Sequence, residues 1–197
     1  MDISAASIKQ LREATGAGVL DCRKALEATA GDFEKAKAWL KDKGLASAAK
    51  KADRVAKDGL IGSYIHHNHR VAVLVEINCE SDFVARTDGF KTLTQSIAKH
   101  IAMGNPLYVK PEDVPAGVLE ETKQGFTAEA HAAGKTGAEL DAEVEKKLNK
   151  FYEEACLLQQ PYVLDEKVTI GSMITQSITD LKENIVVRRF VRYELGA

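Results

Sequence analysis

The longest uninterrupted apolar run in the chain is only five residues, 71–75. A short run rich in β-branched residues predicts a buried strand, and no segment is apolar for long enough to span a bilayer. The segments 59–65 and 70–77 are both strand-like and flank the polar residues 66–69. The sequence therefore predicts a β-hairpin that opens a sheet domain.

Apolar residues at helical spacing follow this hairpin and predict a helix packed on the sheet. The stripe consists of Phe90, Leu93, Ile97 and Ile101. Two further helical stretches, at about 116–133 and about 137–158, predict a helical hairpin. Its first arm has little apolar surface, so we expect the hairpin to project from the core. A helix around 170–178 leads to a last strand over 185–193. We expect this strand to pair with the β-hairpin and complete a small antiparallel sheet.

The first 43 residues predict three short helices. Ser4 caps the first helix, and the segment 16–18 breaks it with two glycines. The second helix ends at Gly31, while Asp32 caps the third and Gly44 stops it. Three short helices with one tryptophan and a few leucines form a minimal bundle of marginal stability.

A change of composition separates this bundle from the sheet domain. Residues 45–57 are mostly Ala, Lys and Arg, so we interpret them as a helical linker. The predicted fold class is α+β, with a three-helix domain at 1–44, the linker at 45–57 and a core domain at 58–197. The helical hairpin of the core domain occupies about 116–158.

The composition is that of a globular protein, with 45% apolar and 28% charged residues. A net charge of −2 and a pI near 6.2 argue against nucleic acid as the main partner. Acids outnumber lysines by nine to two between 112 and 145, so the helical hairpin is acidic. The first residues lack the blocks of a secretory signal, and we expect a cytoplasmic protein that does not enter a membrane.

The three cysteines indicate neither a disulfide framework nor a metal pair. Cys22, Cys79 and Cys156 are odd in number and more than fifty residues apart, so we expect buried, reduced thiols. The glycines of 16–18 resemble a phosphate-binding loop only faintly, because a helix precedes them and no Gly-Lys-Ser/Thr ending follows. A helix–helix turn is the better interpretation.

His66, His67 and His69 form the only histidine cluster in the sequence. Three histidines on a turn can converge on zinc, but no fourth ligand accompanies them. Exposed turn histidines, or one that contacts a partner, are therefore favoured over a metal site. No nucleophile elbow, His-Glu-x-x-His sequence or paired-carboxylate pattern is present. We predict no enzyme, no cofactor and no bound metal.

The predicted strand ends in Ser81, Asp82, Phe83 and Val84, which places a large aromatic side chain where buried structure should end. Such a side chain needs a partner, either inside the fold or on another protein. Composition alone favours the first alternative, in which Ser81 or Asp82 caps a helical turn and Phe83 folds back into the core.

Val19 and Leu20, in the bundle, can likewise pack inside the fold or contact a partner. They directly follow the 16–18 turn and point to different sides of the second helix. Only one of them can easily enter so small a core, and we expect the other to contact a partner.

Two segments of the chain resemble the signature segments of bacterial elongation factor Ts. They are LREATGAGVLDCRKAL at 11–26 and EINCESDFVA at 76–85, in the right order and separation. The likeness extends to 110–114 and to the closing 187–196. It implies a nucleotide-exchange factor that binds elongation factor Tu carrying GDP, expels the GDP and leaves a nucleotide-free GTPase. It also implies that the first domain is a ubiquitin-associated-like bundle.

The resemblance assigns roles to the residues at the strand exit. Asp82 and Phe83, with Ser81 and Val84 on either side, match the residues that dislodge Mg²⁺ from Tu. Phe83 would wedge between helices of Tu near its nucleotide site. Ser81 stands where the family usually has Thr, a mild change that keeps a capping hydroxyl.

Further contacts with Tu are implied for the bundle and for the turn of the β-hairpin. Arg12, Val19 and Leu20 fall where the contacts of the family's first domain lie. We also expect His66 to contact the partner from the core domain.

The chain resembles the short form of the family, because longer members carry two core subdomains and a C-terminal module. A homodimer would supply the missing core half and give a two-to-two complex with Tu, through paired acidic hairpins or edge-to-edge core contacts. Two rival functions are less favoured. One is a helical adaptor that binds ubiquitin-like proteins through the first domain, and the other is a zinc enzyme built on the histidine cluster.

Overall fold

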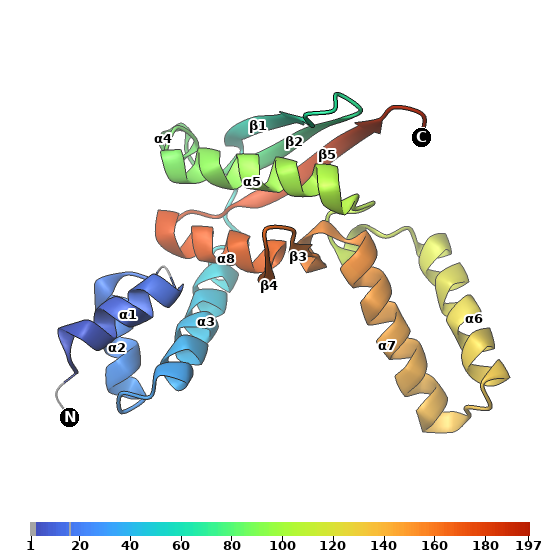
Figure 1. Ribbon diagram of the computed structural model, residues 1–197, viewed down its shortest axis with the longest axis horizontal. Coiled ribbons are helices and arrows are strands. Elements are labelled where there is room, and N and C mark those ends of the chain that lie inside the picture. Colours follow the sequence, from blue (N-terminus) through green and yellow to red (C-terminus); the bar gives the residue numbers. More distant parts are fainter. Residues whose placement is uncertain (1–2, 16) are drawn as a thin grey trace.

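The computed structural model describes residues 3–15 and 17–197 and combines helices with an antiparallel sheet (Figure 1). Met1, Asp2 and Gly16 lie outside the described residues. The predicted α+β class is confirmed: the first helices precede a β-hairpin, a long helix, a helical hairpin and a last strand that returns to the sheet. Among the described residues, no helix is both long and apolar enough to cross a membrane.

The N-terminal region is a bundle of α1 (Ala5–Thr15), α2 (Val19–Ala28) and α3 (Phe33–Ala49). Both predicted caps are confirmed. The Ser4 Oγ accepts the N–H of Ser7 at 3.1 Å, and the Asp32 carboxylate accepts the N–H of Lys35 at 3.0 Å. The bundle core is small and consists of Leu11, Ala17, Cys22, Ala25, Leu26 and Ala36, with larger side chains packed at its margin. Helix α2 ends at Ala28, and Gly31 follows in the turn with φ of +84°.

The prediction that Gly44 stops the third helix is wrong. Helix α3 continues through Gly44 to Ala49, and Gly44 is buried. A Cβ atom at this position would lie 3.6 Å from the Thr179 Oγ1 of α8 (Ile170–Leu181), so the glycine marks where the two helices pack. Tertiary packing outweighs the unfavourable helix propensity of glycine, which costs about 1 kcal/mol. The first part of the expected linker is thus the end of α3, and turns follow it.

The sheet has the strand order β1-β2-β5, and both pairings are antiparallel. Its strands are β1 (Asp58–Ile65), β2 (Val71–Cys79) and β5 (Val186–Glu194), so the predicted β-hairpin and closing strand are confirmed. Helix α5 (Asp88–Gly104) covers one face of the sheet, and the predicted apolar stripe on this helix is buried (Figure 1). Helix α8 packs on α5 and contributes to the same core as the sheet.

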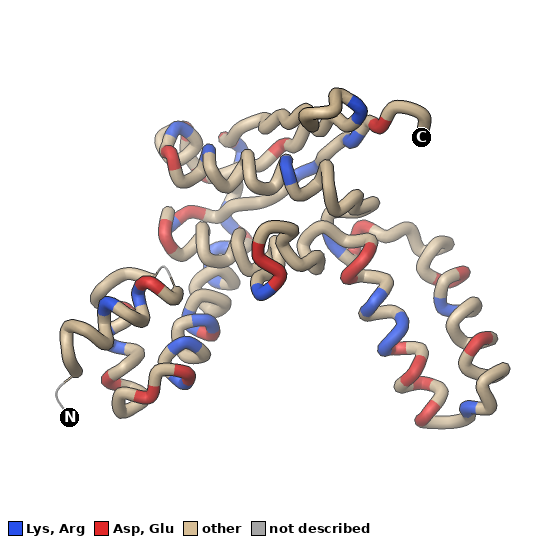
Figure 2. The backbone as a smooth tube through the Cα atoms, viewed as in Figure 1, with Lys and Arg blue, Asp and Glu red and all other residues tan. Residues whose placement is uncertain are grey.

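The helical hairpin consists of α6 (Ala116–Ala132) and α7 (Gly137–Ala155) and projects from the core, as predicted (Figure 1). Short 3₁₀ turns at Pro111–Asp113 and Leu157–Gln159 flank it, and a small hairpin of β3 (Pro161–Tyr162) and β4 (Asp165–Thr169) follows. Acidic residues lie along both arms (Figure 2). The two arms pack on each other, and Lys147 of α7 forms an ion pair with Glu129 of α6 at 2.5 Å.

Candidate functional site

The strand exit forms a single helical turn, α4 (Asp82–Ala85), which exposes its aromatic residue. We call Ser81–Val84 the α4 tip. The Ser81 Oγ accepts the N–H of Val84 at 3.3 Å, so the expected cap is present. Val84 is buried, whereas the side chain of Phe83 is 78% exposed. The alternative in which Phe83 folds back into the core is therefore wrong, because the turn directs Val84 inward and Phe83 outward.

Asp82 lies beside Phe83 on the exposed side of the α4 tip. Its carboxylate pairs with the guanidinium of Arg86 at 2.6 Å, and both side chains are exposed. An exposed pair of this kind contributes little to stability, about 0–1 kcal/mol. Asp82 can therefore exchange Arg86 for a group on a partner at small cost.

A carboxylate from a distant part of the chain holds the α4 tip in place. Glu183, in the turn between α8 and β5, accepts the N–H groups of Glu80 and Ser81, each at 3.0 Å. Its other carboxylate oxygen accepts a hydrogen bond from the Ser81 hydroxyl, with 2.5 Å between the two oxygen atoms. Glu183 has no signature in the sequence, because no local pattern links it to a segment about a hundred residues earlier.

Cys79 lies beneath the same loop and is fully buried. Its thiol donates to the carbonyl oxygen of Ser81 at 3.2 Å. Burial raises the pKa of Cys79 to about 11, and the negative charge of Glu183 acts in the same direction. The residue therefore stays a thiol, which can act as a donor to the loop, and the expectation of a buried free cysteine is confirmed here as for Cys22 and Cys156.

The second exposed apolar surface lies at the start of α2. We call Gly18–Leu20 the α2 tip. Val19 is 52% and Leu20 72% exposed, so neither side chain enters the bundle core. The expectation that one of them would do so is wrong, because the smaller Ala17 is buried at this end of the core instead. Arg12 is exposed in the last turn of α1, which packs on α2.

The α2 tip has fewer fixed contacts than the α4 tip. Gly18 is the N-cap residue and supplies no side-chain cap. Asp21, in the first turn of α2, pairs with Lys43 of α3 at 2.6 Å, and this bond lowers the pKa of its carboxyl group. The Cys22 thiol donates to the carbonyl oxygen of Ala17 at 3.5 Å.

The expected contact residue His66 does not lie near either tip. It stands at the turn of the β1–β2 hairpin, whereas α4 follows the other end of β2. Eight paired residues separate the two ends, which corresponds to about 23 Å. The His66 ring is half-buried, and its Nδ1 lies 3.1 Å from the Tyr64 hydroxyl oxygen. Any contact it makes with a partner belongs to a separate surface.

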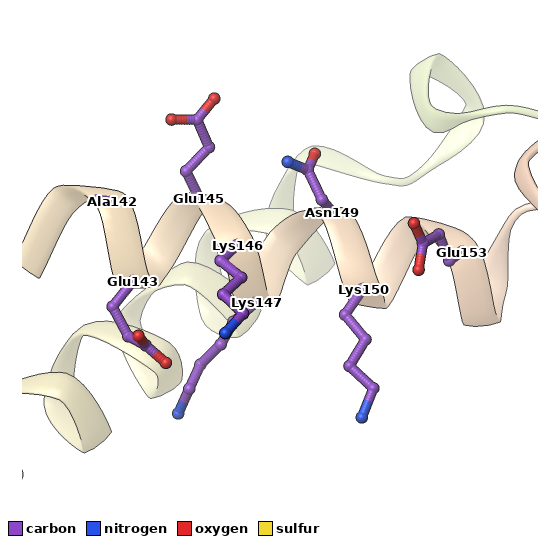
Figure 3. Close-up of a pocket in the computed structure, with 8 residues that line it drawn as sticks. All are labelled: Ala142, Glu143, Glu145, Lys146, Lys147, Asn149, Lys150 and Glu153. Atoms are coloured by element: carbon purple, nitrogen blue, oxygen red, sulfur yellow. The ribbon is translucent and has the colours of Figure 1, made fainter.

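The described residues contain no group of three or more His, Cys, Asp or Glu side chains that could hold a metal ion. His67 and His69 are exposed at the hairpin turn. A shallow depression lies along α7, but all the residues that line it come from this one helix, and Glu145 points away from Lys146 and Lys150 (Figure 3). It does not enclose a ligand.

Exposed apolar tips of this kind are typical of the class of protein that docks on another protein. Two apolar tips are exposed, one on a small bundle and one on a sheet domain. Helix α4 and the bundle helices α1 and α2 lie toward one end of the molecule, and the helical hairpin lies toward the other (Figure 1). An exposed aromatic residue on a fixed backbone is typical of a contact that dominates an interface.

Comparison with known proteins identifies the family. A family model described as elongation factor TS matches residues 44–197. The chain is 52% identical to the elongation factor Ts of Fervidobacterium nodosum and 54% identical to that of Coprothermobacter proteolyticus, in each case over the full length of both chains. It is 49% identical to the elongation factor Ts of Geobacter metallireducens, over 91% of that protein. The chain belongs to the elongation factor Ts family, whose name implies a role in translation elongation.

Proposed function

We propose that this protein is a guanine-nucleotide exchange factor for elongation factor Tu. It binds Tu carrying GDP, disturbs the Mg²⁺ site of Tu through Asp82 and Phe83, and promotes release of GDP without covalent chemistry. The observation that carries the proposal is the 78% exposure of Phe83 on a tip whose backbone is fixed by Glu183. Membership of the elongation factor Ts family supports the choice of partner.

The energy of exchange requires more than one contact. To weaken GDP binding ten-thousandfold, the factor must prefer the nucleotide-free form of Tu by about 5.5 kcal/mol. Burial of one phenylalanine contributes about 1.5–3 kcal/mol, so Phe83 cannot supply this preference alone. The α2 tip, with Arg12 beside it, offers a second apolar surface of suitable size, and His66 offers a third point of contact on the core domain.

Reciprocity then makes the factor catalytic. Nucleotide-free Tu binds the exchange factor more tightly than Tu carrying GDP does. GDP and Mg²⁺ must therefore weaken the binding of the exchange factor to Tu in the same ratio as the exchange factor weakens the binding of GDP. Rebinding of nucleotide therefore releases the factor for another cycle.

The proposed assembly is a homodimer that binds two molecules of Tu. The sheet face opposite α5 supports it, because residues paired across the strands share a face and five large apolar side chains lie on this one. They are Ile61, Ile65, Leu74, Val191 and Tyr193, each at least 39% exposed. A second copy of the same face is the occupant we propose, since two such faces can pack as a sandwich. This surface replaces the hairpin and edge contacts as the favoured interface.

Release of a fluorescent GDP analogue from Tu tests the exchange function. We expect the wild-type protein to accelerate release, and Phe83→Ala to lose most of the acceleration while it stays folded. Leu164→Ala is a matched control, because Leu164 is 68% exposed in the turn between β3 and β4. If the folded Phe83→Ala variant accelerates release as well as wild type, the proposed wedge is wrong.

Sedimentation tests the homodimer. We expect wild type to sediment as a dimer and Leu74→Glu as a monomer, because the substitution buries a charge in the proposed interface. Leu164→Glu, on another surface, should stay dimeric. A monomeric wild type at all concentrations would contradict the dimer but not the exchange function.

The alternative function, an adaptor for ubiquitin-like proteins, uses the bundle alone. It engages Val19 and Leu20 but leaves the fixed, exposed Phe83 without a role. Binding of a ubiquitin-like protein by the wild type, with no acceleration of GDP release, would favour the adaptor.

A further inference from the structure

The turn between α8 and β5 connects three parts of the fold. Lys182 closes α8 in the left-handed conformation, with φ of +65°, and Glu183 and Asn184 follow. The Asn184 amide is buried and donates to the carbonyl oxygens of Ala52 and Arg54, in the segment that follows α3. The backbone N–H of Asn184 donates to the Glu80 carboxylate at 2.6 Å.

Glu183 acts on the residues directly before α4. Its two carboxylate oxygens accept three hydrogen bonds, two from the backbone of Glu80 and Ser81 and one from the Ser81 hydroxyl. Hydrogen bonds to a charged acceptor are about twice as strong as neutral ones. Ser81 is also the residue that caps α4 through the Val84 N–H, so Glu183 orients the cap itself.

Helix α4 cannot hold its own orientation. It is four residues long, and a single helical turn fixes several backbone dihedrals in return for very few hydrogen bonds. The buried side chain of Val84 anchors one side of the turn. The approach of the chain to this turn is set at Glu80 and Ser81, where Glu183 binds.

We propose that Glu183 is a positioning residue for nucleotide exchange, acting through the α4 tip. The inference rests on the proposed exchange function. A tip that is ordered before docking loses less conformational entropy when it enters the partner, so more of the contact energy of Phe83 is available to displace nucleotide. Its effect is exerted through the backbone N–H and the hydroxyl of Ser81.

The test compares maximal GDP-release rates for wild type, Glu183→Ala, Glu183→Gln and Phe83→Ala, together with the double variant Glu183→Ala/Phe83→Ala. We expect Glu183→Ala to lower the maximal rate about tenfold, since a 1 Å misplacement of an acting group can cost up to about a hundredfold. Glu183→Gln keeps one carbonyl acceptor and should fall between. Glu143→Ala is the matched control, because Glu143 pairs with Lys135 in the helical hairpin and should leave the rate unchanged.

The double variant separates positioning from general stability. If Glu183 acts through the tip, its removal in the Phe83→Ala background changes the rate by less than about twofold, because the two effects are coupled. Two results overturn the inference: a wild-type rate in folded Glu183→Ala or Glu183→Gln, or equal effects of the Glu183 change in both backgrounds. Failure of wild type itself to accelerate release would instead reject the exchange function.

Discussion

The α4 tip and the α2 tip both expose large apolar side chains, but the chain supports them differently. At the α4 tip, the three hydrogen bonds that Glu183 accepts and a serine cap fix the backbone beneath Phe83. At the α2 tip, Gly18 gives no side-chain cap, and the nearest long-range restraint is a partly exposed ion pair between Lys43 and Asp21. Under the proposed exchange function, we expect a division of labour in which the α4 tip displaces nucleotide and the α2 tip holds the partner.

The two tips also stand on cores of different size. Among the described residues, the α2 tip lies over a bundle core of six buried side chains, whereas the α4 tip lies over the much larger sheet core. Leu26→Ala should lower the free energy of unfolding of the bundle by about 2–5 kcal/mol. A core this small supplies little more than that, so we expect the bundle to unfold. We expect Cys22 to become reactive to a thiol reagent while Cys79 stays protected, as measured by mass spectrometry.

Ile97→Ala is the matched change in the sheet core, and it should increase labelling of Cys79. If Leu26→Ala exposed Cys22 and Cys79 equally, the bundle and the sheet domain would unfold as one unit. The bundle core under the α2 tip and the sheet core under the α4 tip would then not differ in stability.

The next effect concerns pH. Because burial raises the pKa of Cys79 from 9.0 to about 11, the unfolded chain loses this proton before the folded one does. The stabilising contribution is therefore complete below pH 9 and is lost as the pH rises toward 11. Denaturant unfolding of wild type and Cys79→Ala above and below pH 9 measures this contribution of Cys79 to the free energy of unfolding. The same dependence on pH in both proteins would show that folding does not raise the pKa of Cys79.

Ser81 provides a smaller test of the same support. Ser81→Ala removes the cap of α4 and a donor to Glu183, with an expected local cost of about 0.5–2 kcal/mol. Faster hydrogen exchange at the Val84 amide should report it. Ser81→Thr keeps the hydroxyl and should behave like wild type, so similar exchange in the Ala and Thr variants would refute the role of the hydroxyl.

The smallest effect is expected at the α2 tip. Lys43→Ala removes a partly exposed ion pair, worth about 0.2–1 kcal/mol. Because the bond to Lys43 is the main cause of the lowered pKa of Asp21, that pKa should rise toward 3.8. An NMR titration of the Asp21 carboxyl group measures the change. An unchanged pKa would mean that the ion pair is not formed.

Much of the fold was predictable because its signals are local. The stripe from Phe90 to Ile101 has a spacing that only a helix satisfies, and the caps at Ser4 and Asp32 use neighbouring residues. Gly44 was misinterpreted for the opposite reason. Its environment is set by α8, more than a hundred residues later in the chain, and no local pattern reveals that contact.

The site was predictable only in part. The sequence identifies Phe83 as unusual, but composition favoured burial, and its exposure depends on the turn that directs Val84 inward instead. Glu183 was not predictable, since a single glutamate after a helix has no distinguishing pattern. Its contact with Ser81 forms only when β5 pairs with β2 and brings the α8–β5 turn beside Ser81.

One measurement tests the division of labour most directly: the maximal rate of GDP release from Tu and the concentration of factor that gives half of it, for Phe83→Ala and Leu20→Ala. We predict that Phe83→Ala lowers the maximal rate about tenfold or more with little change in the half-saturating concentration. Leu20→Ala should raise that concentration and leave the maximal rate intact. If both variants change the same parameter to the same extent, the two tips do not differ in function.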